Sequence, residues 1–253
     1  VIDAGNILLG LGRNASKIDN IFITHSHLDH IYDIPFLVDT FFDKRNKPIT
    51  IYGLEESINN LKKYLLNDDI WPNFCEIDFL EHKEKALEFK IVELNKEIIL
   101  DDKTIIKPVE NNHTTASCGF VITKNNNSTL FTSDTYKSDS IWEEVNNNKS
   151  IKSVIIDVSY PSKLSTLAKR SKHLTPELLK EELELLKRDD VRIYINHIKP
   201  IYLDILTQEI TDLNLLINDG KILEDNDVVS LSNEYKAYTK KSTFTNQKEI
   251  DNL

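Results

Sequence analysis

The sequence predicts an α/β fold, because short apolar segments rich in β-branched residues alternate with amphipathic segments along the chain. The 253 residues are 40% hydrophobic, which is enough to build a sizeable core without disulfides or a structural metal ion. There is no internal repeat and no shift in composition before the polar C-terminus. We therefore expect one domain over residues 1–231 and a polar tail over residues 232–253.

The N-terminal third predicts two units of a strand followed by a helix. Residues 21–24 form an apolar run of the buried-strand type, and residues 49–52 form a second run, which Gly53 ends. After each run, apolar residues recur at helical spacing and predict a helix. They are Ile34, Leu37, Val38 and Phe41 after the first run, and Leu54, Ile58, Leu61 and Leu65 after the second.

The middle of the chain predicts successive strands with little helix between them. The expected strands cover residues 89–94, 104–109, 119–123 and 129–132. The polar residues 124–128 join the last two of these strands as a hairpin-type connection.

The C-terminal part returns to alternating strands and helices. Residues 154–156 and 191–195 are expected strands on either side of a helix that has Thr175 as its N-cap and Pro176 at its first position. A last helix is expected over residues 203–217, and residues 219–220 are expected to turn into a final strand pair.

The charge and the cysteines restrict the partners and the compartment. A formal net charge of −10 disfavours tRNA or duplex DNA, which proteins hold through clustered lysine and arginine contacts to phosphates, but it permits a small anion held by metal ions. No run approaches the roughly 18 apolar residues of a membrane span, and no signal peptide is visible. Cys75 and Cys118 form no CxxC pattern, so we expect ordinary thiols in a cytoplasmic protein, with one disulfide as the alternative. The chain starts at Val1 and lacks methionine, so we expect an incomplete N-terminus.

Four potential metal ligands follow the first predicted strand within six residues: His25, His27, Asp29 and His30. His25 and His27 alternate, so an extended backbone directs both side chains the same way, while Asp29 and His30 lie in the turn beyond and can face a second ion. Imidazole and carboxylate without thiolate suit divalent zinc, manganese or iron. Of the seven histidines, all but His82 fall at predicted strand ends or loop entries, and we expect His82 to be a solvated residue.

The segment His25-Ser26-His27-Leu28-Asp29-His30 resembles the HxHxDH signature of the metallo-β-lactamase superfamily. This resemblance implies an αββα sandwich of two mixed β-sheets flanked by helices, with two metal ions, expected to be zinc, at the strand ends. It further implies that Asp3 orients the metal-binding loop and that Asp134 bridges both ions. The implied ligand set is His25, His27, Asp29, His30, His113, Asp134 and His197.

Three further segments resemble the class II 3′,5′-cyclic-nucleotide phosphodiesterases within that superfamily. Residues 67–74 match its "N…IWP.F" stretch, residues 172–178 match its "GHLTP" segment with Lys172 where glycine is usual, and residues 197–200 match its His-Ile-Lys-Pro. Tyr32 and Asp33 depart from the family pattern. Trp71 and Phe74 fit either the core or the wall of a pocket where a nucleobase stacks.

The resemblance implies a hydrolase that opens the 3′ phosphoester bond of cAMP or cGMP to give a 5′-monophosphate. Asp29 and His173 are the expected catalytic residues, and His173 is the candidate proton donor to the leaving oxygen. Thr175 is expected to cap its helix, with a phosphate contact as the alternative. A homodimer is left open.

Three other functions remain open at this point. A tRNA 3′-processing endonuclease would use the same metals, but the chain has no insertion rich in lysine and arginine and its charge is acidic. The others are a thioester or lactam hydrolase of the same fold and a non-enzymatic scaffold, which would be expected to have lost ligands.

Overall fold

The computed structural model describes residues 1–81, 83–224, 227–230 and 236–238. A three-stranded sheet is formed by β1 (Asn20–Phe22), β2 (Ile49–Gly53) and β3 (Leu87–Ile91), which pair in parallel in this order. The helices of this part are α1 (Ile7–Leu11), α2 (Leu28–Ile31), α3 (Asp33–Phe41) and α4 (Glu55–Tyr64).

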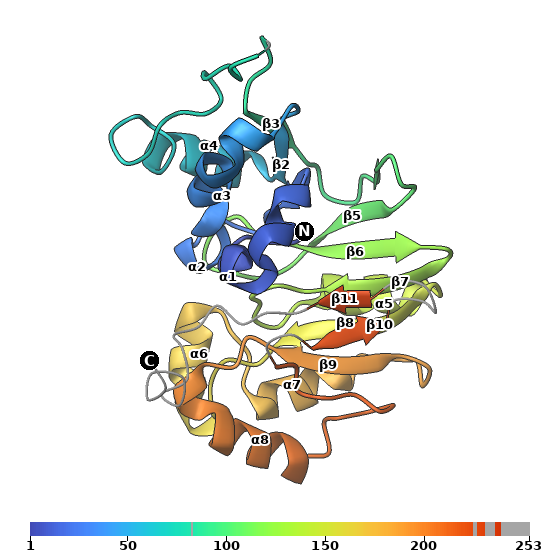
Figure 1. Cartoon of the computed structure of the whole chain (residues 1–253). Coiled ribbons are helices and arrows are strands. Elements are labelled where there is room, and N and C mark those ends of the chain that lie inside the picture. Colours follow the sequence, from blue (N-terminus) through green and yellow to red (C-terminus); the bar gives the residue numbers. More distant parts are fainter. Residues whose placement is uncertain (82, 225–226, 231–235, 239–253) are drawn as a thin grey trace.

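A six-stranded mixed sheet occupies the centre of the molecule (Figure 1). Its strands neighbour one another in chain order: β4 (Ile98–Ile99), β5 (Ile105–Glu110), β6 (Cys118–Lys124), β7 (Asn127–Phe131), β8 (Ile151–Asp157) and β9 (Arg192–Asn196). The pairs from β4 to β7 are antiparallel, and those from β7 to β9 are parallel. Strands β5, β7, β8 and β9 therefore run the same way, and their carboxyl ends meet at one edge of the sheet.

Helices of the C-terminal part are α5 (Asp139–Asn147), α6 (Ser165–Ser171), α7 (Pro176–Leu183) and α8 (Leu203–Asp212). Figure 1 shows α3 and α4 beside the small sheet at one end of the molecule and α6, α7 and α8 at the opposite end. Short 3-10 helices cover Gly12–Lys17, Phe42–Lys44, Ser162–Leu164 and Pro200–Tyr202. Among the described residues, none of the helices combines the length and apolar character that a membrane crossing needs.

Three hydrophobic clusters separate four layers. One cluster packs α1, α3 and α4 onto the small sheet, and the largest packs α5, α7 and α8 onto the six-stranded sheet. Between the two sheets lies a cluster in which Phe22 stacks on Tyr52 at 4.3 Å between ring centroids and meets the edge of Phe120 at 5.7 Å. The expected αββα sandwich is thus confirmed.

The helix start at Thr175 is confirmed, whereas the end of the last predicted helix differs from expectation. The Thr175 Oγ1 accepts a hydrogen bond from the Leu178 amide, and its side chain is fully buried, which favours capping over a phosphate contact. The last predicted helix ends at Asp212 rather than at 217, because Asn214 takes a left-handed φ of 53°. At the N-terminus, Ile2 makes an isolated parallel bridge to Phe22.

The C-terminal strand pair comes later than expected. After Gly220, Ile222 makes only an isolated parallel bridge to Ile195, and the pair itself consists of β10 (Val228–Ser230) and β11 (Lys236–Tyr238). Strand β11 therefore lies inside the segment 232–253 that the sequence predicts as a tail, while most of that segment lies outside the described residues. The division at residue 231 stays a prediction.

Candidate metal centre

The first four candidate ligands lie where β1 ends and the chain opens into α2. Asp3 fixes this segment, because its carboxylate accepts hydrogen bonds from the Thr24 amide (2.8 Å) and the Thr24 hydroxyl (2.9 Å) and contacts the His30 Nδ1 (2.7 Å). Asp3 therefore contacts the ligand segment at both of its ends, which matches the orienting role that the resemblance implies.

A close backbone approach at Gly5 presses the same segment into place. The Ala4 amide donates to the His30 carbonyl at 2.7 Å, and the Asp33 amide donates to the Ala4 carbonyl at 2.7 Å. A Cβ atom on Gly5 would lie 1.7 Å from the Asp29 carbonyl oxygen, so only glycine fits without moving the backbone of Asp29.

Gly5→Ala is expected to lower the free energy of unfolding by about 2 kcal/mol and to weaken metal binding, because the added methyl must displace the Asp29 backbone. Urea unfolding and a metal titration check both effects. Gly53→Ala is the control for crowding alone, because the atoms nearest to its Cβ belong to the Ile23 and Ile58 side chains, with Ile23 Cγ1 at 2.6 Å. It should lower the free energy of unfolding but leave metal affinity unchanged. Unchanged metal affinity in Gly5→Ala would contradict this account of the close approach.

Four side chains come together on one side of the cluster: His25, His27, His113 and Asp134. The His27 Nδ1 lies 2.9 Å from the His25 Nε2 and 3.2 Å from the His113 Nε2, and Asp134 Oδ2 lies 3.9 Å from both Nε2 atoms. Tetrahedral bonds of about 2.0–2.2 Å place neighbouring ligand atoms roughly 3.3–3.6 Å apart, so these separations fit one divalent ion.

A second group shares Asp134 with the first: Asp29, His30, Asp134 and His197. The Asp29 Oδ2 lies 3.6 Å from the Nε2 atoms of both His30 and His197. Asp134 contributes its two oxygens, with Oδ2 at 3.4 Å from His30 Nε2 and Oδ1 at 3.2 Å from His197 Nε2. A carboxylate placed between two groups in this way can bridge two ions.

The second ring nitrogen of each of four histidines has a fixed partner outside the cluster. The His25 Nδ1 contacts the Thr24 hydroxyl at 3.0 Å and the His30 Nδ1 contacts Asp3. The His113 Nδ1 lies 3.2 Å from the Lys172 carbonyl, and the His197 Nδ1 lies 2.8 Å from the Ser159 hydroxyl. Such contacts fix the ring orientation and the tautomer of metal-ligating histidines, leaving Nε2 for the ion.

Two buried atoms at the centre of the cluster, the His30 Nε2 and the Asp134 Oδ1, make no hydrogen bond of good geometry and lie near other ligand atoms, at 3.4 Å from the Asp134 Oδ2 and 3.2 Å from the His197 Nε2 respectively. A buried polar atom without a well-formed hydrogen bond costs free energy. A cation bound among the surrounding ligand groups would supply the missing partner for both atoms. The donor set of imidazole nitrogens and carboxylate oxygens suits zinc, manganese or iron. The residues present therefore fit a pair of divalent ions.

Burial and mutual charge set the protonation of the cluster. Burial, reinforced by His30, lowers the pKa of His25 to about 2, so His25 is neutral and its nitrogen lone pair is available. Burial alone would lower the pKa of His197, but the carboxylates of Asp134, Asp157 and Asp29 raise it to about 10. Burial alone would raise the pKa of Asp134, but His197 and His30 hold it well below its ordinary value. Protonated His197 and ionised Asp134 thus form a buried charge pair, and a bound cation would displace the proton of His197.

His173 lies beside the cluster and is held by a residue that the sequence did not single out. Its Nδ1 lies 2.7 Å from the Oδ2 of Asp157, a fully buried carboxylate at the end of β8. The Ser159 hydroxyl donates to Asp157 Oδ1 at 2.6 Å and also contacts His197. The signal for Asp157 was in the sequence, because it ends a buried strand just as Asp134 follows β7.

All seven predicted ligands and His173 are brought together by the fold, while His82 lies outside the described residues. His197 has a left-handed backbone with φ at 62°, and so do the residues that precede Asp134 and His173, with φ at 59° for Ser133 and 58° for Lys172. Strained backbone of this kind concentrates at functional sites. It also explains why glycine is usual at position 172 in the family pattern, since glycine adopts this conformation without steric cost.

Trp71 and Phe74 both pack in the N-terminal core cluster. Phe74 is 5% exposed and lies 5.7 Å from Phe42 between ring centroids. Trp71 is half-buried and meets Phe36 at 4.8 Å. Cys75 and Cys118 are both free thiols, which excludes the single disulfide.

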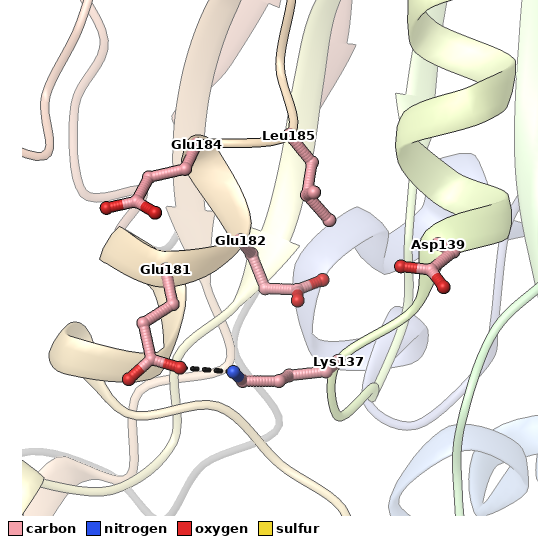
Figure 2. Close-up of a pocket in the computed structure, with 6 residues that line it drawn as sticks. All are labelled: Lys137, Asp139, Glu181, Glu182, Glu184 and Leu185. Atoms are coloured by element: carbon pink, nitrogen blue, oxygen red, sulfur yellow. Dashed lines mark hydrogen bonds and ion pairs between the residues drawn. The ribbon is translucent and has the colours of Figure 1, made fainter.

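A surface pocket of about 570 Å³ lies away from the cluster, between α7 and the start of α5 (Figure 2). Its acidic side chains include Glu182, whose buried carboxylate accepts hydrogen bonds from the Ser138 amide (3.0 Å) and the Trp142 indole (2.9 Å). Lys137 pairs with Glu181 across the same pocket. These contacts join α7 to α5, so we assign the pocket's polar groups a structural role.

The four-layer sandwich and the two joined ligand groups define a metal-dependent hydrolase of the metallo-β-lactamase fold. The structure resembles the metallo-β-lactamase-fold protein YhfI of Bacillus subtilis with a TM-score of 0.66 at 16% identity, covering 87% of this chain and 82% of that one. The family model of the class-II cAMP phosphodiesterases matches residues 13–243, and the chain belongs to this family.

Two relatives are similar over most of the chain. A protein of Yersinia pestis described as a probable 3′,5′-cyclic-nucleotide phosphodiesterase is 23% identical, with 79% of this chain and 70% of that protein covered. The unliganded structure of yeast PDE1 has a TM-score of 0.66 at 21% identity and covers 82% of this chain and 67% of that one. These likenesses support the assigned fold.

Proposed function

We propose that the chain hydrolyses 3′,5′-cyclic nucleotides, breaking the bond between phosphorus and the 3′-oxygen to give 5′-monophosphates. The observation that carries the proposal is the convergence of the other six predicted ligands around Asp134 in a member of the class-II family. The cytoplasm is the proposed compartment, supported by the two free thiols.

Two divalent ions, with zinc as the first choice, would be held by the two ligand groups that share Asp134. When bound, such ions supply activation of water and neutralisation of the charge that develops on the phosphoryl oxygens. The chain's own contribution is to hold the ligands: the outer contacts of Thr24, Asp3, Lys172 and Ser159 fix four imidazoles before any ion arrives.

Asp29 and His173 are the proposed catalytic side chains. The Asp29 side chain is 47% exposed, whereas that of Asp134 is 3% exposed, so Asp29 is the carboxylate that an incoming water molecule can reach. It would accept a hydrogen bond from that water and orient it toward phosphorus.

His173 would donate the proton that the departing 3′-oxygen needs. Because its Nδ1 is bonded to Asp157, its Nε2 is the nitrogen left for the substrate. The ring packs 5.3 Å from His197 and 5.2 Å from His113 between centroids, so the proton would be delivered at the edge of both ligand groups. Asp157 would stabilise the protonated ring and fix its orientation.

The proposal is tested by incubating the metal-loaded protein with cAMP, cGMP, a precursor tRNA and bis-p-nitrophenyl phosphate. We expect turnover of the cyclic nucleotides and the artificial diester, with 5′-AMP and 5′-GMP as the products by chromatography. Turnover of only the precursor tRNA would replace the proposed function with an RNA-processing one. Formation of 3′-AMP would contradict the direction of cleavage.

A further inference from the structure

A strip of apolar side chains begins at the metal centre and runs along a helical face. Tyr32 has helical backbone angles (φ −55°, ψ −40°) and connects α2 to α3, so residues 28–41 form a nearly continuous helix. Leu28, Tyr32 and Phe36 recur every four residues and share one side of it. Leu28 is 59% exposed and Tyr32 is 50% exposed, so this side faces solvent.

The same face carries a candidate metal ligand into the cluster. Asp29 lies three residues before Tyr32 on this helix, and its carboxylate reaches the Nε2 atoms of His30 and His197. Side chains three residues apart on a helix are neighbours. Tyr32 therefore neighbours Asp29, whose side chain is 47% exposed, on the surface of the helix.

Packing behind Tyr32 fixes the orientation of the strip. The Tyr32 ring meets Phe36 at 5.3 Å between centroids, and Phe36 meets Trp71 at 4.8 Å in an edge-on arrangement. Trp71 comes from the loop after α4, and its indole nitrogen is buried without a hydrogen-bond partner. The indole is thus placed by ring packing rather than by a polar contact, as a support for Phe36.

We propose that Tyr32, flanked by Leu28 and supported by Phe36 and Trp71, is the platform on which the nucleobase of the substrate stacks. This inference rests on the proposed function, because it takes the phosphate of the nucleotide to lie at the metal centre. An aromatic ring next to a phosphate site can stack on any of the bases, since every base has a π-face. The platform therefore strengthens nucleotide binding without selecting adenine over guanine.

The test compares ligands with and without a base on the metal-loaded protein. The affinities of 5′-AMP and of ribose 5-phosphate are measured by calorimetry for the wild type, Tyr32→Ala and Tyr32→Phe. We expect Tyr32→Ala to weaken 5′-AMP binding about tenfold and to leave ribose 5-phosphate binding unchanged, whereas Tyr32→Phe keeps the wild-type affinity because its ring is intact. Tyr64→Ala is the control, since Tyr64 is 61% exposed at the end of α4.

Two results would overturn the platform. One is an equal loss of both ligands in Tyr32→Ala, which would mean a damaged phosphate or metal site. The other is an unchanged 5′-AMP affinity in Tyr32→Ala, which would mean that the base does not stack on this ring. A wild type that binds 5′-AMP and ribose 5-phosphate but hydrolyses no cyclic nucleotide would instead refute the proposed function alone.

Discussion

Asp134→Asn is expected to reduce kcat on cAMP by about 10³-fold or more and to lower the metal content of the protein. Asp134 is the side chain that the two ligand groups share, and its two oxygens face different histidines. The amide keeps the shape but has one oxygen and no charge, so it cannot bridge two cations. A loss of several kcal/mol in charge stabilisation corresponds to this factor, at about 1.4 kcal/mol for each tenfold change.

Metal content by elemental analysis and steady-state kinetics check the effect of Asp134→Asn. The matched control is Asp101→Asn, because Asp101 is exposed and lies outside the cluster. A variant that keeps both ions and stays within tenfold of the wild-type kcat would remove Asp134 from the bridging position.

His173→Ala is expected to reduce kcat on cAMP by about 10²–10⁴-fold while the bound metal stays in place, which is the usual contribution of acid catalysis. The reason is the ribose 3′-oxygen, a strongly basic leaving group that needs a proton. Bis-p-nitrophenyl phosphate releases a weakly basic phenolate, so its turnover should fall far less. Asp157→Asn should give the same pattern more weakly, because the imidazole remains and only its buried partner is changed.

The comparison of the two substrates separates acid catalysis from a structural role. His82→Ala serves as the control, being the histidine predicted to lie outside the site. If His173→Ala slowed both substrates equally and lost metal, His173 would be a ligand rather than a proton donor. This second outcome is a real alternative, because His173 also lies in a third group of potential ligands with Asp134, Asp157 and His197.

The predictions from sequence succeeded where the cause was local. The cap at Thr175 and the shared direction of the His25 and His27 side chains depend on neighbours within a few residues, so the spacing alone indicated them. The helix α5 was not anticipated, because Ile141, Trp142 and Val145 are few apolar residues among asparagine and glutamate.

The pairing of His173 with Asp157 could not be read from the chain. It depends on the loop before α7 lying against the chain that follows β8, where the Ser159 amide donates to the Leu174 carbonyl at 3.2 Å. Asp157 and His173 are 16 residues apart, and no local signal in either segment indicates this contact. The end of α8 at Asp212 was also not predicted. Asn214 adopts a left-handed φ of 53°, which asparagine tolerates but which the sequence pattern does not indicate.

The proposed ligands come from both layers of strands: His25, His27, Asp29 and His30 follow β1, whereas His113, Asp134 and His197 follow strands of the larger sheet. Ions held by this set would link the three-stranded sheet to the six-stranded sheet. The two sheets also pack together through the apolar cluster around Phe22 and Phe120. Free metal at a hundredfold excess over its Kd would add about 2.7 kcal/mol to the free energy of unfolding. The metal concentration would then affect the stability of the folded protein as well as its catalytic rate.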